Sequence, residues 1–138
     1  MEPFIKDISV KDKRQNVLLR SQKLATAIYL VSNFLSDHDP LKWRLRDRAV
    51  SLMSQSSRLA YETATLEIDQ IVSLIDVGLA SQLVSEMNFS ILKNEYLNLR
   101  KLLVDLLTHQ VGELDQDLLV RLPPTPTSPS PRLATGEK

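Results

Sequence analysis

The sequence predicts an all-α protein: an antiparallel four-helix bundle followed by a disordered, proline-rich C-terminal tail. Three observations favour this fold class. Leucine is abundant, while only 5% of the residues are aromatic, and this composition points to helices. Glycine occurs only three times in 138 residues, too rarely for a turn-rich β protein. Apolar residues also recur at intervals of three, four and seven positions, as one face of a helix requires.

The N-terminal half of the chain is expected to form an arm and two helices. Residues 1–13 mix apolar and charged side chains, and we expect a loosely ordered arm there. The first helix is predicted over about 13–35, and Asp39 and Pro40 give a typical N-cap and first position for a second helix over about 40–61. Serines weaken the end of that helix. The expected apolar positions are Val17, Leu18, Leu24, Ala25, Ile28, Val31, Phe34 and Leu35 in the first helix, and Leu41, Leu45, Ala49, Leu52 and Met53 in the second.

The C-terminal half is expected to form two more helices and a tail. The helix predicted over about 64–83 is the most apolar one, and Gly78 within it indicates either a close helix contact or a helix end. Ser85 is expected to cap a fourth helix over about 86–108, which Gly112 can terminate. The bundle then spans 14–122. Residues 123–138 begin with PPTPTSPSP and are expected to be a disordered linker or a peptide ligand for a partner domain.

Composition and motifs exclude several functional classes. The chain has no cysteine, which rules out disulfides, thiolate zinc sites and cysteine nucleophiles. No signal peptide fits the N-terminus, and the longest weakly polar run, 24–35, is too short to span a bilayer. We therefore expect a cytoplasmic protein without membrane contact.

The sequence shows no pattern typical of an enzyme. It lacks a P-loop, the G-x-G-x-x-G, H-E-x-x-H and G-x-S-x-G motifs, and a cluster of metal-ligating residues around His38 or His109. Glu62, Glu67 and Asp69 are the nearest approach to a carboxylate cluster, and we interpret them as a solvated helix start. We expect no catalysis, cofactor, metal or small-molecule substrate.

The zero net charge hides two halves of opposite sign. Residues 1–61 carry eleven basic and six acidic residues, and residues 62–138 carry six and eleven. The densest basic run lies on the second predicted helix, where Lys42 and Arg46 share one side and Arg44 and Arg48 lie about 160° away. Ion pairs within the bundle, head-to-tail contact between subunits, and phosphate contact with RNA or DNA are all consistent with it. The candidate contact residues are Lys42, Trp43, Arg44, Arg46, Arg48 and Arg58.

One resemblance covers about residues 20–108. The stretch LKWRLRDRAVSL at 41–52 and the stretch SQLVSEMNF at 81–89 resemble motifs of the four-helix-bundle proteins encoded in ribosomal RNA intervening sequences. The accessory proteins of diversity-generating retroelements belong to the same group. The resemblance implies a pentameric bundle that binds nucleic acid or a reverse transcriptase. Gln82 stands where that group has a helix-ending glycine, and the group's N-I-A-E-G motif is absent.

A second resemblance is to the helical half of uncharacterised bacterial helix-turn-helix proteins. It rests on DPLKWRLR at 39–46 and LVSEMNFSILK at 83–93, and it implies a dimerising or sensing module. We therefore expect a non-catalytic bundle that self-associates and scaffolds a protein or nucleoprotein partner. The alternative is a nucleic-acid-binding accessory factor that uses the basic second helix.

Overall fold

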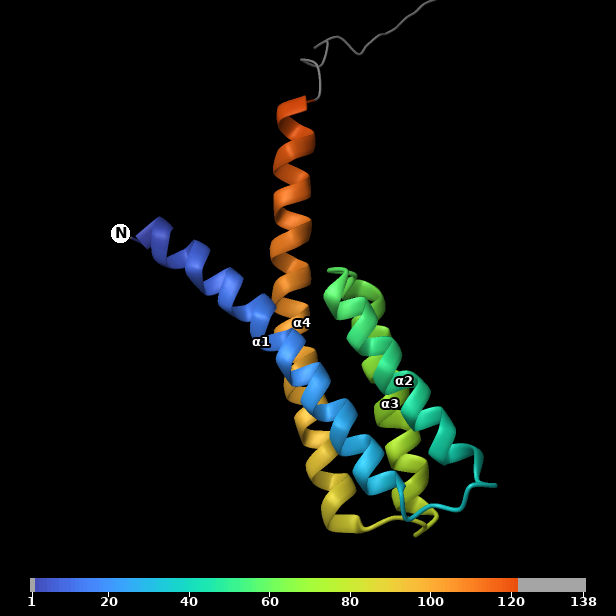
Figure 1. Ribbon diagram of the computed structural model, residues 1–138. Coiled ribbons are helices and arrows are strands. Elements are labelled where there is room, and N and C mark those ends of the chain that lie inside the picture. The colour runs from blue at the N-terminus through green and yellow to red at the C-terminus, as the bar shows by residue number, and fades with distance from the viewer. Residues whose placement is uncertain (1, 122–138) are drawn as a thin grey trace, which may run out of the picture. The chain divides into compact units, whose positions relative to one another are not determined.

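The structure, a computed structural model, describes residues 2–121, with side chains from Val10 onward. It contains four α-helices, α1 (Glu2–Ser32), α2 (Pro40–Ser57), α3 (Tyr61–Ala80) and α4 (Glu86–Arg121) (Figure 1). No strand occurs among these residues, so the all-α prediction is confirmed. The antiparallel direction of the helices stays a prediction, and the predicted tail at 123–138 lies outside the described residues.

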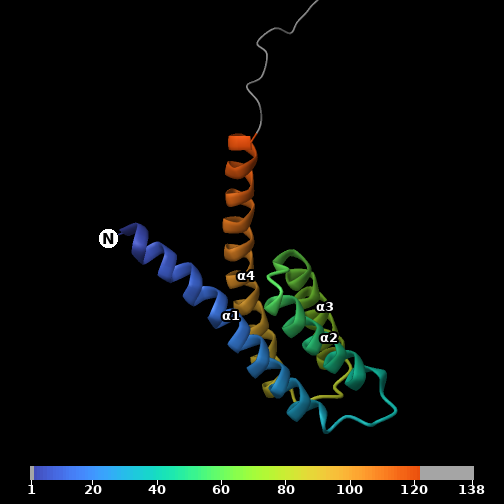
Figure 2. The same cartoon turned by 45° about the horizontal axis from the view of Figure 1, so that its top comes forward.

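The chain divides into two compact units, Met1–Thr108 and His109–Lys138. In the first unit, α2 packs against both α1 and α3 (Figure 2). Ion pairs link α4 to α3 and to α1 there: Arg100–Asp69 at 2.8 Å, Lys93–Asp76 at 2.8 Å and Lys13–Asp105 at 3.9 Å. In the second unit, the described residues are the last turns of α4, and none of their side chains is buried.

An apolar core fills the first unit and draws on all four helices. The predicted inner face of the second helix is confirmed, because Leu41, Leu45, Ala49 and Leu52 are all buried. Complete burial of a leucine or isoleucine side chain contributes roughly 1.5–3 kcal/mol to folding. The other buried apolar residues are Val17, Ala25, Ile28, Leu35, Tyr61, Ala64, Ile68, Ile71, Ile75, Phe89, Leu92, Tyr96, Leu99, Leu103 and Leu106.

Helix α1 differs from its prediction at both ends. It begins at Glu2, so the segment 1–13, predicted to be a loosely ordered arm, is helical from its second residue. Pro3 lies in the first turn, where its missing N–H is not needed, and the segment has no glycine. At the other end α1 stops at Ser32. Phe34 therefore leaves the helical face on which it was predicted to lie, and it is 89% exposed.

The predicted weak end of the second helix is confirmed. Helix α2 stops at Ser57 instead of continuing to residue 61, and the N–H of Arg58 donates to the carbonyls of Ser54 and Gln55. Leu59 then takes a φ of 60°, in the left-handed region that reverses the chain after a helix. This turn lets α3 begin at Tyr61, three residues earlier than predicted.

Glycine plays different parts at its two positions in the helices. A methyl group on Gly78 would lie 3.3 Å from Cδ2 of Leu41 and 3.4 Å from the Val84 methyls. Of the two explanations for Gly78, the structure supports the close helix contact. Gly112, by contrast, does not end α4 as predicted, since the helix continues to Arg121. Leucines continue beyond it and no proline interrupts before 121, so the modest cost of one glycine does not stop the helix.

The caps of α2 and α4 agree with the predictions. Asp39 accepts a hydrogen bond from the N–H of Leu41 at 2.9 Å, with Pro40 in the first turn. The Ser85 hydroxyl accepts from the N–H of Asn88 at 3.3 Å, as a serine N-cap does. Across residues 2–121, none of the helices is long and apolar enough to cross a membrane.

Replacing Gly112 by alanine should slow amide hydrogen exchange in residues 109–121. Alanine favours an exposed helix interior by about 1 kcal/mol over glycine, which corresponds to about fivefold slower exchange by local opening. No neighbouring atom lies within 4 Å of the added methyl group. Gly78→Ala is the control. The same gain in helix propensity is expected there, but the added methyl group would crowd Leu41 and offset it. Equal exchange in wild type and Gly112→Ala would contradict a stable helix through this position.

Candidate protein-interaction site

The basic run of α2 is divided between two neighbouring helices. Lys42 and Arg46 reach toward the end of α1 and the connection 33–39. Arg48 instead pairs with Glu67 on α3, with 3.1 Å between Nη1 and Oε1. The run is therefore not one continuous basic surface.

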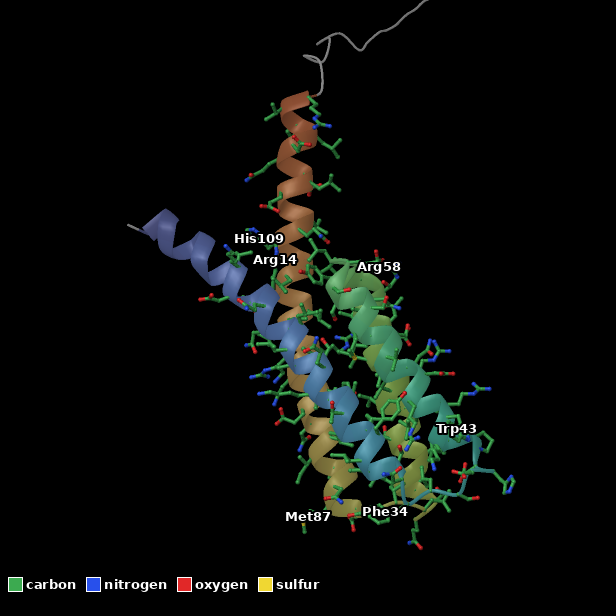
Figure 3. All side chains as sticks on the ribbon, in the orientation of Figure 1. Arg14, Phe34, Trp43, Arg58, Met87 and His109 are labelled. Atoms are coloured by element: carbon green, nitrogen blue, oxygen red, sulfur yellow. The ribbon has the colours of Figure 1, made fainter. Side chains whose placement is uncertain are left out.

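Arg44 and Arg58 are the exposed basic residues of the predicted set. Arg44 and Arg48 line the same shallow hollow of about 310 Å³, which confirms that they share a side of the helix. Asp69 also lines this hollow and reduces its positive charge. Arg58 lies beyond the end of α2, near the turn to α3 (Figure 3).

Lys42 is buried and anchors the connection between α1 and α2. Its ammonium group lies 2.6 Å from Oδ1 of Asp37 and 3.4 Å from the carbonyl oxygen of Leu35. The hydrogen bond from Lys42 and its charge hold the pKa of the Asp37 carboxyl below its ordinary value. A buried charge needs such partners because burial otherwise disfavours the ionised form. Lys42 is therefore a structural residue and does not offer its charge to a ligand.

Arg46 binds the last turn of α1 and the residue that follows it with three hydrogen bonds. Its Nε donates to the Ser32 hydroxyl at 2.9 Å, and its Nη2 donates to the Tyr29 carbonyl at 3.1 Å and to Oδ1 of Asn33 at 2.9 Å. The guanidinium carbon lies 4.6 Å from the ring centre of Tyr29 and 5.3 Å from that of Trp43. Both distances are within the range of cation–π attraction.

Two contacts besides that with Arg46 hold the Trp43 side chain in place. Its indole N–H donates to the carbonyl of Asp37 at 2.8 Å, and the Lys42 ammonium lies 5.3 Å from its ring centre. Trp43 and Tyr29 nevertheless remain 47% and 42% exposed. We call Tyr29, Arg46 and Trp43 the aromatic–arginine surface. Figure 3 shows Trp43 at the start of α2, beside the connection from α1.

Glu67 organises a buried polar network between α2 and α3. Its carboxylate accepts hydrogen bonds from Arg48, from the Ser51 hydroxyl at 2.8 Å and from Nε2 of Gln55 at 2.9 Å. The interpretation of Glu67 as part of a solvated helix start is therefore wrong. Glu67 follows the buried Ala64 by three residues, which places it on the inner face of α3.

The other two carboxylates of that predicted cluster lie elsewhere. Glu62 is exposed in the first turn of α3. Asp69 forms a two-point ion pair with Arg100 of α4, with distances of 2.8 and 3.2 Å, and this bond raises the pKa of the arginine. The three carboxylates consequently do not form an acid–base pair.

The histidines and buried tyrosines form no reactive cluster. His38 is exposed in the connection, and His109 lies 3.3 Å from Glu113 on the next turn of α4. Within residues 10–121, whose side chains the structure describes, no three histidine, aspartate or glutamate side chains converge as metal ligands would. Burial raises the pKa of both Tyr61 and Tyr96, in the case of Tyr61 against the opposing charge of Arg14. Both phenols therefore stay neutral and serve the core.

No protein-family model, curated protein or solved structure matches this chain. The resemblances to the intervening-sequence proteins and to the helix-turn-helix proteins stay predictions. Gln82, which stands at the helix-ending glycine of the first group, has a φ of 60°. Glycine adopts this left-handed conformation without strain.

Removing the Glu67 carboxylate should destabilise the protein markedly. Glu67→Ala leaves three donors of α2 without their acceptor, and we expect a loss of about 2–3 kcal/mol in the free energy of unfolding, measured by urea denaturation. Glu62→Ala, in the exposed first turn of the same helix, should cost less than about 1 kcal/mol. Equal losses would show that the network contributes nothing beyond the charge at the helix start.

Asp37→Asn should destabilise the protein only when the carboxyl is ionised. A pKa lowered by folding stabilises the native state above the unfolded-state pKa, ordinarily 3.8, and this contribution disappears as the pH falls through the folded pKa. Urea midpoints of wild type and Asp37→Asn should therefore differ at neutral pH and converge in acid, below pH 3.8. Asp47→Asn, on the exposed side of α2, is the control. A gap independent of pH would contradict the ion pair.

Proposed function

We propose that this protein is a cytoplasmic, non-catalytic helical scaffold that self-associates and binds a protein partner through the aromatic–arginine surface. One observation carries the proposal: the Arg46 guanidinium contacts two half-exposed aromatic rings, those of Tyr29 and Trp43. Tryptophan, tyrosine and arginine are the residues most enriched among those that dominate protein–protein binding energy.

The rigidity of this surface supports the same role. Binding normally costs free energy because side chains at an interface lose rotamer freedom. Here the Arg46 guanidinium already donates three hydrogen bonds within the chain, and the Trp43 indole N–H donates one. Both side chains have therefore lost this freedom before a partner arrives. A partner would therefore meet an indole ring and a guanidinium whose orientations are set in advance.

The charges favour a protein over a nucleic acid as the partner. Nucleic-acid binding depends on basic side chains that neutralise phosphates. Within the basic run, Lys42 is paired with Asp37 and Arg48 with Glu67. The accessory-factor alternative, with RNA, DNA or a reverse transcriptase as partner, consequently rests on Arg44 and Arg58.

Wild type, Trp43→Ala and Leu66→Ala are each immobilised and exposed to the same cell extract, and the proteins that each retains are compared. The retained partner is then purified, and its affinity for each of the three variants is measured. Leu66 is an apolar residue of α3 that is 56% exposed and serves as the matched control. Loss of a central tryptophan typically costs 2 kcal/mol or more, so we expect binding at least about thirtyfold weaker for Trp43→Ala. Leu66→Ala should bind like wild type.

The same proteins also test the alternative. Fluorescence anisotropy with a short RNA and a short DNA at two salt concentrations measures nucleic-acid affinity. Tight, salt-dependent binding that is lost in Arg44→Glu/Arg58→Glu but kept in Trp43→Ala would overturn the proposal in favour of the accessory factor. A partner bound equally by Trp43→Ala and Leu66→Ala would also overturn it.

A further inference from the structure

Large apolar side chains are exposed where the α1–α2 connection meets the start of α4. Phe34 is 89% exposed and Met87 is 72% exposed, and Figure 3 shows both at the same end of the helices. Leu83 and Ile91 are each more than half exposed, and Ile91 follows Met87 by one helical turn. We call Phe34, Leu83, Met87 and Ile91 the Phe34 surface. Proteins that act as monomers rarely expose large apolar side chains together in this way.

A hollow of about 290 Å³ adjoins this surface, and Phe34 and Leu83 are the two members of the surface that line it. An apolar cavity of about 150 Å³ accommodates a benzene molecule, so the hollow has room for a phenyl ring. Phe34 stands at its border, and Ser85 and Asn88 provide its polar residues. The remaining lining is apolar: Val31, Leu35, Leu83, Val84 and Phe89.

The Phe34 surface is nearly free of charge. Between residues 30 and 36, and between residues 83 and 91, the only charged residue is Glu86. Like charges that meet across a symmetric interface repel one another. With one charged residue per copy, this surface keeps that repulsion small, whereas the last turns of α4 carry Glu113, Asp115 and Asp117 within five residues.

We propose that two copies of the chain pair through the Phe34 surface, with Phe34 of each copy inserted into the hollow of the other. The inference specifies the self-association in the proposed function and rests on it. A two-fold interface requires one patch that is complementary to itself. The Phe34 surface meets this requirement because it carries both a protruding aromatic ring and an apolar hollow that fits one. Its lack of basic residues disfavours an anionic membrane or a nucleic acid as occupant.

Light scattering after size exclusion, over a range of protein concentrations, tests the pairing. Wild type should have twice the chain mass of 15.6 kDa. Phe34→Asp should be monomeric at the same concentrations, with a dimer dissociation constant raised at least tenfold. Leu66→Asp, at an apolar position of α3 that is 56% exposed, should remain a dimer. Because Phe34 is almost fully exposed, its replacement should leave the circular dichroism spectrum and the urea midpoint of the monomer unchanged.

Cross-linking supplies a second measurement that does not depend on the Phe34 variant. The chain contains no cysteine, so Met87→Cys and, as the control, Val50→Cys each provide a single thiol. A short bismaleimide should join two Met87→Cys chains efficiently and two Val50→Cys chains poorly. Adding Phe34→Asp to Met87→Cys should abolish the product.

Several results would overturn the pairing. They are a monomeric wild type, a dimer that survives Phe34→Asp, equal cross-linking at the two cysteines, or a pentamer, which a two-fold contact alone cannot build. A purified heterologous partner that occupies the surface while the chain stays monomeric would overturn it as well. Partner binding through Trp43 is measured separately on the Phe34→Asp monomer, so failure of the pairing is distinguishable from failure of the partner surface.

Discussion

The hydrogen bonds of Arg46 to the last turn of α1 determine how the first two helices join. These bonds take up the carbonyl of Tyr29 and the side chains of Ser32 and Asn33, just where α1 ends and its terminal groups need partners. Lys42 secures the following residues from the same side of α2. The connection 33–39 is thereby held close to α2. Two consequences follow: Tyr29 and Trp43 are both brought within cation–π distance of one guanidinium, and Phe34 is directed away from the core.

Several charged residues of this protein join its helices. Lys42 and Glu67 are both buried, and each meets its partners within hydrogen-bond distance. A buried ion pair adds little net stability, but removal of one partner is costly because the other charge is left uncompensated. Three of the basic residues that resemble a nucleic-acid contact in the sequence, Lys42, Arg46 and Arg48, thus hold the fold together. What remains for recognition is the exposed aromatic and apolar area around them.

The two proposed surfaces suit a scaffold because they complement each other. A dimer formed through the Phe34 surface would present two aromatic–arginine surfaces in a fixed relation. A partner with two binding elements, or a partner that is itself a dimer, would then gain affinity from the second contact without any new type of interaction. Both surfaces include residues that end or follow α1, so the position at which α1 ends bears on partner binding and on pairing.

Helix number, most of the core and both serine and aspartate caps were predictable from the sequence, because apolar spacing and capping depend on residues close together in the chain. Leu45, Leu52, Ile68 and Leu103 could be assigned to the inner faces in this way. The spacing also separated Lys42 and Arg46 from Arg44 and Arg48.

The sequence could not predict which residues each side of that helix contacts. Whether Arg46 contacts phosphate, a second subunit or Tyr29, and whether Glu67 is solvated or buried, depends on which residues distant in sequence lie opposite. Only the tertiary structure decides that, because burial and hydrogen-bond partners arise when helices pack. The same holds for Phe34, whose exposure follows from the early end of α1 and the docking of the connection onto α2.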